Sequence, residues 1–213
     1  MKREEKSIED LHLVFFAPMT HNLIDVVSGN SPQVTGTMSA FDASKGLYFN
    51  GSSGLAWNFS QLAFNPTLLN SDSSFTILCD YNRTERSGHD WFIVIGTDSN
   101  KRLIGFLYDY NQNNITCALS NKEYPGWNTQ TNQHTSLNTQ YNNCGLWYDG
   151  ANRTVNKIIN GSIVYTAASS SFPSLISSYK LYIGQSSYSG DKMNGYLRNV
   201  RVYLSDFSDR MLM

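Results

Sequence analysis

Short hydrophobic runs separated by turn residues recur along most of this 213-residue chain. Their length and partial alternation predict short strands, and no stretch shows a helical period longer than two turns. Hairpin-like spacing between the runs favours an antiparallel sandwich or jelly roll. Before the last third of the chain, the strands predicted with most support cover 11–16, 45–50, 54–58, 73–82, 91–96, 103–108 and 114–119.

The last third of the chain gives the clearest pattern. Two hydrophobic runs flank Asp149-Gly150, and the second is followed at once by Asn160-Gly161. Such pairs are favoured where a hairpin needs positive φ, so this segment predicts strand, turn, strand, turn, strand. Two more strands are predicted at 180–184 and 193–204. In the last of these the alternation breaks near Asn199, which predicts a bulge or a twist.

Composition adds a polar surface with few charges. Hydrophobic residues make up 40% of the chain, enough for a sizeable core, whereas charged residues make up only 15% and the net charge is −1. A basic field for nucleic acid and a polybasic membrane patch are both absent, so we expect no nucleic-acid partner and no membrane insertion. We predict a charged N-terminal arm at 1–10 and one all-β domain at 11–213.

The three cysteines, Cys79, Cys117 and Cys144, all fall within apolar, strand-like runs. They show no CxxC spacing, and no paired histidine accompanies them, so a zinc site is not expected. We interpret them as small buried hydrophobic residues of the core. A disulfide between two of them stays open, provided that those two lie on adjacent strands.

Five segments occur in an order that resembles the concanavalin A-like lectin/glucanase superfamily, and within it the laminin-G-like jelly rolls. The chain departs from the usual pattern at Asn50, where an aspartate is common, and at Cys79 or Asp80, where a tryptophan is usual. The resemblance implies an all-β fold, an antiparallel two-sheet jelly-roll sandwich. The segments are LHLVFF with Asp25 and Ser28-Gly29, then KGLYFNGSSGL, SSFTILCDYN, LWYDGANRTVNKIINGSIV, and KLYIGQSS with MNGYLRNVRVYL.

Catalysis is not expected. The resemblance implies that glycosidases of this fold carry carboxylates at alternate positions of a strand, which places acid and nucleophile on one face. No two acidic residues stand at i and i+2 here, although Asp80 and Asp109 could converge from different strands. We predict no cofactor. Relatives often hold one calcium ion, and Asp25, Asp109 and Asp191 are candidate donors, but no motif selects the ligands and we predict no metal.

Glycan binding needs an aromatic ring to stack on a sugar, with amides and hydroxyls for its rim. Two clusters offer this combination. Tyr124, Trp127 and Asn128 lie in the Asn/Thr/Gln-rich stretch 120–140, and Tyr188 with Asp191 lies in QSSYSGDK. The competing interpretation is that Trp127 folds back over the sheet. Strand patterns surround the other tryptophans, so we predict core positions for Trp57, Trp91 and Trp147.

The leading functional hypothesis is a non-catalytic bacteriophage virion component, a capsid decoration or fibre-associated protein that displays a lectin-like domain. The chain as given begins without an export signal, and a virion protein is made in the host cytoplasm yet reaches the outside. Its partners would be other virion proteins or copies of itself, and cell-surface glycans. The 1–10 arm would be a docking segment or a solvated tail. The alternatives are a glycan-binding module of a bacterial surface protein or carbohydrate-active enzyme and, remotely, a glycoside hydrolase.

Overall fold

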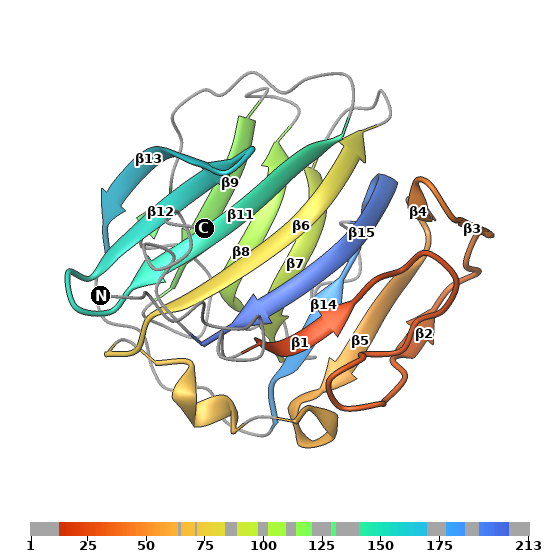
Figure 1. Cartoon of the computed structure of the whole chain (residues 1–213), viewed down its shortest axis with the longest axis horizontal. Helices are drawn as coiled ribbons and strands as arrows, with labels where there is room; N and C mark the ends of the chain where they lie inside the picture. Colours follow the sequence, from red (N-terminus) through yellow and green to blue (C-terminus); the bar gives the residue numbers. More distant parts are fainter. Residues whose placement is uncertain are drawn as a thin grey trace, which may run out of the picture.

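Two antiparallel β-sheets face each other in the computed structural model (Figure 1). It describes residues 13–63, 65–70, 72–83, 89–97, 102–109, 114–120, 129–130, 141–169, 178–185 and 192–204. In order, sheet A holds β13 (Ser162–Ala168), β12 (Thr154–Ile159), β11 (Asn142–Asp149), β6 (Phe75–Arg83), β15 (Asn194–Tyr203), β4 (Gly46–Asn50) and β3 (Phe41–Asp42), with β1 (Leu13–Ala17) also paired to β15. Sheet B holds β10 (Thr129–Gln130), β9 (Asn114–Leu119), β8 (Arg102–Asp109), β7 (His89–Gly96), β14 (Lys180–Ile183), β5 (Gly54–Asn58) and β2 (Gln33–Thr35).

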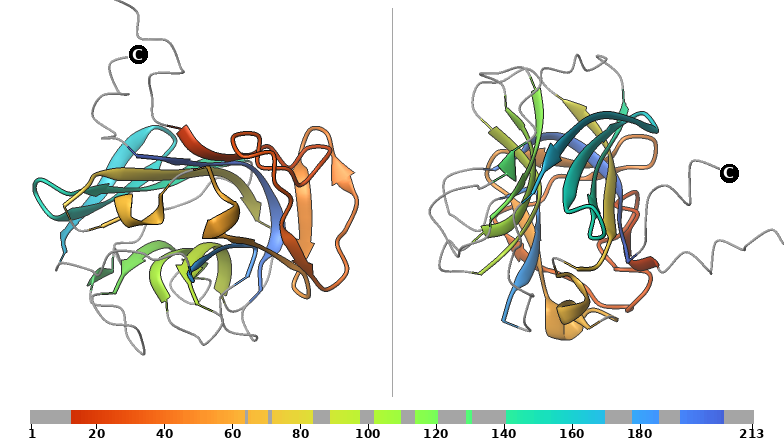
Figure 2. Two further views of the ribbon diagram at one scale, coloured as in Figure 1. Left: turned by 90° about the horizontal axis from the view of Figure 1, so that it is seen from below. Right: turned by 90° about the vertical axis from the view of Figure 1, so that its left-hand side faces the viewer.

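The predicted fold class is confirmed, and the predicted strands agree closely with the observed ones. The runs 54–58 and 114–119 become β5 and β9 with the same bounds, and the other predicted strands shift by one or two residues at their ends. The short strands β2, β3 and β10 were not predicted. Short 3₁₀ turns at Phe59–Gln61 and Pro66–Leu68 lead from β5 towards β6. Figure 2 shows the two layers edge-on, with sheet A above sheet B in its left-hand view.

The main core fills the space between the sheets and is rich in aromatic rings. Tyr81 of sheet A lies 4.2 Å from Phe92 of sheet B between ring centroids, and Phe92 packs edge-to-face on Phe106 at 5.1 Å. The three cysteines are buried in this core as free thiols, which confirms their predicted role. Cys79 and Cys144 are direct cross-strand partners, yet no disulfide joins them.

Both predicted hairpins of the last third are present, but only one has the predicted backbone. Asn160 and Gly161 have φ of 50° and 79°, as a two-residue hairpin turn requires. At the other turn the prediction of positive φ at Asp149-Gly150 is wrong, because Arg153 takes that conformation with φ of 50°. Asp149 instead accepts the N–H groups of Ala151 and Asn152 through Oδ1, so its side chain shapes a longer turn.

The three tryptophans that the structure describes divide between the main core and two smaller clusters. All three are buried as predicted, and Trp57 lies in the main core, where its Nε1 donates to the Asn30 carbonyl. The other two are also core residues as predicted, but they belong to two smaller core clusters, because alternation turns them to the outer faces of the sheets. Trp91 packs over sheet B with Ala56, Val94, Leu107 and Tyr182, and Trp147 packs over sheet A with Leu78, Ile158, Tyr203 and Leu13.

The N-terminal arm predicted at 1–10 lies outside the described residues, as does the end of the chain beyond 204. Within the described part of the chain, no helix has the length and apolar character needed to span a membrane.

Candidate functional site

All five residues predicted to bind glycans lie outside the described part of the chain: Tyr124, Trp127, Asn128, Tyr188 and Asp191. Their assignment therefore stays a prediction. The ends of the segment that carries Tyr188 and Asp191 are described, because Gln185 and Lys192 pair in an isolated β-bridge.

Asp25, one of the candidate calcium donors, forms hydrogen bonds within the protein instead. Its carboxylate is fully buried and accepts the backbone N–H groups of Phe16, Val27 and Ser28 and the Ser28 hydroxyl. These bonds hold the turn that carries Ser28-Gly29, so the motif is a structural one. Among the described residues, no group of three or more His, Cys, Asp or Glu side chains is arranged to hold a metal ion.

The carboxylates considered for hydrolysis do not converge. Asp80 stands on the outer face of sheet A, because its neighbours Cys79 and Tyr81 point into the core. Asp109 ends β8 in sheet B, where Leu107 on the same face packs in the outer cluster. The two therefore lie on opposite sides of the sandwich, which is incompatible with an acid and a nucleophile flanking one bond.

A polar and aromatic surface does form on the outer face of sheet A, where β4, β15 and β6 lie side by side. The strand register places Tyr48, Tyr196 and Asn82 in one row across these three strands. The rings of Tyr48 and Tyr196 are 5.0 Å apart between centroids and tilted by 46°. Both rings are only partly buried, as is Asn82. We call the surface formed by Lys45, Tyr48, Asn82, Asn194, Tyr196 and Arg198 the tyrosine platform.

Several polar groups of the platform remain available to a ligand. The Tyr48 hydroxyl donates to Asn194 Oδ1 at 2.7 Å, which orients both side chains. The side-chain amide of Asn82 and the hydroxyl of Tyr196, by contrast, form no hydrogen bond with any residue that the structure describes. The exposed Lys45 ammonium lies 5.4 Å from the Tyr196 ring centroid and forms no ion pair within the described chain. The platform thus offers a ring, an amide, a phenol and a cation.

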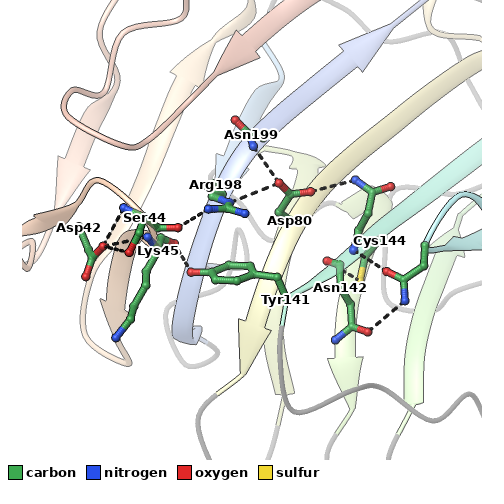
Figure 3. A network of polar contacts seen from close by, with 11 residues as sticks. Asp42, Ser44, Lys45, Asp80, Tyr141, Asn142, Cys144, Arg198 and Asn199 are labelled. Carbon is green, nitrogen blue, oxygen red and sulfur yellow. Dashed lines mark hydrogen bonds and ion pairs between the residues drawn. The ribbon is translucent and has the colours of Figure 1, made fainter.

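Asp80 organises the side of the platform that faces β11 (Figure 3). Its Oδ1 accepts Asn143 Nδ2 at 2.9 Å, and its Oδ2 accepts Asn199 Nδ2 at 2.7 Å and Arg198 Nε at 3.4 Å. Asn199 has φ of 53° at a break in the β15 register, so the bulge predicted near Asn199 is confirmed. The bulge aims Arg198 and Asn199 at one carboxylate from consecutive positions.

The turn before β4 is tied to the same network. Asp42 Oδ1 accepts the backbone N–H groups of Ser44 and Lys45 and the Ser44 hydroxyl, and this hydroxyl bond is the main reason that the pKa of Asp42 is lowered. The carbonyls of Ser44 and Lys45 then accept Arg198 Nη1 and the Tyr141 hydroxyl. The turn that carries Lys45 is therefore held against β15 and the start of β11.

Tyr141 covers the guanidinium of Arg198. The Arg198 Cζ lies 4.2 Å from the Tyr141 ring centroid, a cation–π contact. Burial raises the pKa of the Tyr141 phenol to about 12, although the positive charge of Arg198 acts in the opposite direction. The phenol is therefore neutral at physiological pH and serves as a hydrogen-bond donor.

The sequence alone does not predict the tyrosine platform, because the residues that form it are far apart in the chain. Tyr48 and Tyr196 are separated by 148 positions and meet only through the pairing of β4 with β15. One local signal was available. Tyr196 and Arg198 stand at i and i+2, so alternation places the tyrosine on the charged side of its strand.

Comparison with known proteins identifies the family. The model of the concanavalin A-like lectin/glucanases superfamily matches residues 56–210. The chain belongs to this superfamily. Among curated protein sequences, none matches the chain.

Several solved structures share the fold of this superfamily member. Domain 4 of AbnA, a GH43 extracellular arabinanase from Geobacillus stearothermophilus solved with arabinotriose, has a TM-score of 0.69 and 16% identity over 92% of this chain and 94% of that one. The CBM40 of the Ruminococcus gnavus IT-sialidase, solved with α2,3 sialyllactose, has a TM-score of 0.54 and 17% identity. The match covers 66% of this chain and 80% of that one. The binding domain of botulinum neurotoxin DC, in complex with SialylT, has a TM-score of 0.67 and 11% identity. The match covers 97% of this chain and 51% of that one.

Proposed function

We propose that the chain is a non-catalytic carbohydrate-binding domain and that its tyrosine platform contacts the sugar. The observation that carries the proposal is the partly buried pair of Tyr48 and Tyr196 beside polar groups that remain available in the described structure. A tyrosine ring offers an apolar face, and Asn82 offers both a donor and an acceptor to sugar hydroxyls. The complexes of arabinotriose and sialyllactose with proteins of the same fold support this class of ligand.

The platform is built before any ligand arrives. Asn194 orients Tyr48, and Asp80 with Arg198 braces the strand that carries Tyr196. Side chains held in this way lose little conformational freedom on binding, which favours affinity. A polar surface with few charges also suits a neutral or weakly charged sugar better than a highly charged polymer.

Replacing the central ring tests the proposal. On a glycan array, and then by calorimetry with the best oligosaccharide, we expect Tyr196→Ala to lower affinity about tenfold or more, because a stacked ring is lost. Phe16→Ala is the matched control, since Phe16 is a partly buried ring on the same sheet face with Arg201 over it at 5.3 Å. The control is expected to bind like the unmodified chain.

Two further variants separate the function from its location. If Trp127→Ala or Tyr188→Ala abolishes binding while Tyr196→Ala does not, the glycan binds at one of the clusters predicted from the sequence and the platform assignment is wrong. If the unmodified chain binds no glycan, the proposed function is wrong. Release of reducing ends from polysaccharides would contradict the non-catalytic assignment.

The biological setting remains the one proposed from the sequence, a bacteriophage virion component that displays this domain. Membership of the superfamily is consistent with this setting, since a lectin-like domain on a virion would contact cell-surface glycans. Neighbouring reading frames for capsid and tail proteins would support the proposal. Placement of the domain within a long bacterial multidomain protein would favour the alternative, a glycan-binding module of a surface protein or carbohydrate-active enzyme.

A further inference from the structure

The four strands that end the two strand orders differ greatly in length. Sheet B ends in β2 and β10, with three and two residues, and one end of sheet A is β3, with two residues. At the other end of sheet A lies β13, with seven residues. Short edge strands are one way in which proteins limit pairing with another chain, and β13 lacks this protection.

The sequence of β13 also lacks most other forms of protection. SIVYTAA contains no charged residue and no proline, and Ser162, Ile163, Val164, Thr166 and Ala168 are all exposed. One irregularity exists, because the register with β12 shifts between Lys157 and Ile158, which leaves Val164 as an extra residue. The four residues Tyr165–Ala168 after it are paired regularly with β12 and present their other edge outward.

We propose that β13 pairs with β13 of a second copy of this chain, so that sheet A continues across a two-fold axis. An antiparallel strand is complementary to itself in backbone hydrogen bonding, and a two-fold interface requires such self-complementarity. No like charges oppose each other, since β13 is uncharged, and a net charge of −1 gives little repulsion between the copies. These properties favour a second copy of the same strand as the partner of β13.

The dimer has a geometric consequence that rests on the proposed function. A two-fold axis perpendicular to the sheet leaves the outer faces of both copies of sheet A on the same side. Figure 1 looks onto this face, with β13 at one border and β15 towards the other. Nine strand-to-strand steps separate the two copies of β15, and at about 4.8 Å a step the two tyrosine platforms lie about 43 Å apart. The dimer would bind a glycan-covered surface with two sites.

The pairing can be tested without any glycan. By sedimentation velocity between about 1 μM and about 1 mM, we expect the unmodified chain to shift from monomer to dimer. Thr166 lies near the middle of the regular stretch, so Thr166→Lys and Thr166→Glu each place like charges across the axis and should stay monomeric. Both lose the Thr166 bond to Asn156 equally. An equal mixture of the two variants should form dimers again, which a misfolded variant could not do.

Val34→Lys places a lysine on β2, the three-residue edge of sheet B, and is the matched control that should dimerise like the unmodified chain. A monomer at every concentration would overturn the pairing, whatever the chain binds. A dimer that Thr166→Lys does not disrupt would overturn the choice of β13.

Bivalent binding is tested on a dense glycan surface and with the same oligosaccharide free in solution. The dimer should dissociate at least about tenfold more slowly from the surface than Thr166→Lys, with equal affinity for the free sugar. Equal dissociation from the surface would overturn the same-side arrangement of the two platforms. Loss of binding to the free sugar in both proteins would instead contradict the proposed function.

Discussion

Asp80 shows how one carboxylate can support a surface made by distant segments. Three side chains donate to it, from β11 and from two consecutive positions of β15. Its side chain is 19% exposed and that of Arg198 is 28% exposed, so solvent screens the ion pair only in part. Hydrogen bonds to a charged group are worth more than those between neutral groups, which makes Asp80 the residue on which the network depends most.

Removing the Asp80 carboxylate should therefore weaken both stability and binding. For Asp80→Ala we expect the free energy of unfolding to fall by about 1–3 kcal/mol, because three donors lose their acceptor. Urea denaturation measures this change. Asp80→Asn keeps one acceptor oxygen and should lose less. A value for Asp80→Ala within about 0.5 kcal/mol of the unmodified chain would show that the network adds little.

At the residue scale, the sequence could predict burial better than it could predict contacts. Cys79, Trp57 and the closing strand were assigned correctly, because local alternation reports which face is apolar. The partners of Tyr48 could not be assigned, since they depend on which strands pair. Trp147 shows the same limit. Its burial was predicted, but only the packing with Tyr203 from β15 shows that it covers an outer face.

At the scale of elements, the bulge in β15 is the feature that the alternation predicted best. Gly195 to Arg198 pair with β6 in one register, and the strand resumes at Arg201 in another. Asn199 occupies the left-handed region within this break and donates its backbone N–H to the Pro18 carbonyl. Asparagine tolerates this conformation far better than a β-branched residue, so the residue type and the bulge agree.

Substitutions at Asn199 separate backbone strain from the side-chain bond. Asn199→Gly keeps the backbone conformation and loses only the bond to Asp80, so we expect a loss of about 1 kcal/mol in the free energy of unfolding. Asn199→Val adds the strain of a β-branched residue at positive φ and should lose a further 1–2 kcal/mol or so. Urea denaturation of both variants gives the difference. Equal losses in the two would contradict the strain at this position.

At the scale of the whole molecule, Lys157 connects the two sheets. Its side chain starts on β12, is fully buried, and donates from Nζ to Asn114 Oδ1 at 2.9 Å and to the Ile115 carbonyl at 3.0 Å, both on β9. Burial lowers the pKa of this lysine from 10.5 to about 8, while the nearby Cys117 thiol acts in the other direction. The sandwich thus holds a cation that releases its proton more easily than an exposed lysine does.

This shift predicts how stability depends on pH. Below about pH 8 Lys157 is protonated in both states, whereas between about pH 8 and 10.5 the unfolded chain holds a proton that the folded chain has released. The unfolded state then binds more protons, so the contribution of Lys157 to the free energy of unfolding rises with pH in this window. Cys79 and Cys144 act in the opposite sense at alkaline pH, because burial raises the pKa of both thiols.

A comparison of variants isolates the lysine from the thiols. We expect the free energy of unfolding of the unmodified chain, minus that of Lys157→Met, to be constant below about pH 7 and to increase from about pH 8 to 10.5. Urea denaturation at a series of pH values gives this difference, in which the cysteine contributions cancel. Parallel curves for the unmodified chain and Lys157→Met would show that burial does not lower the pKa of this lysine.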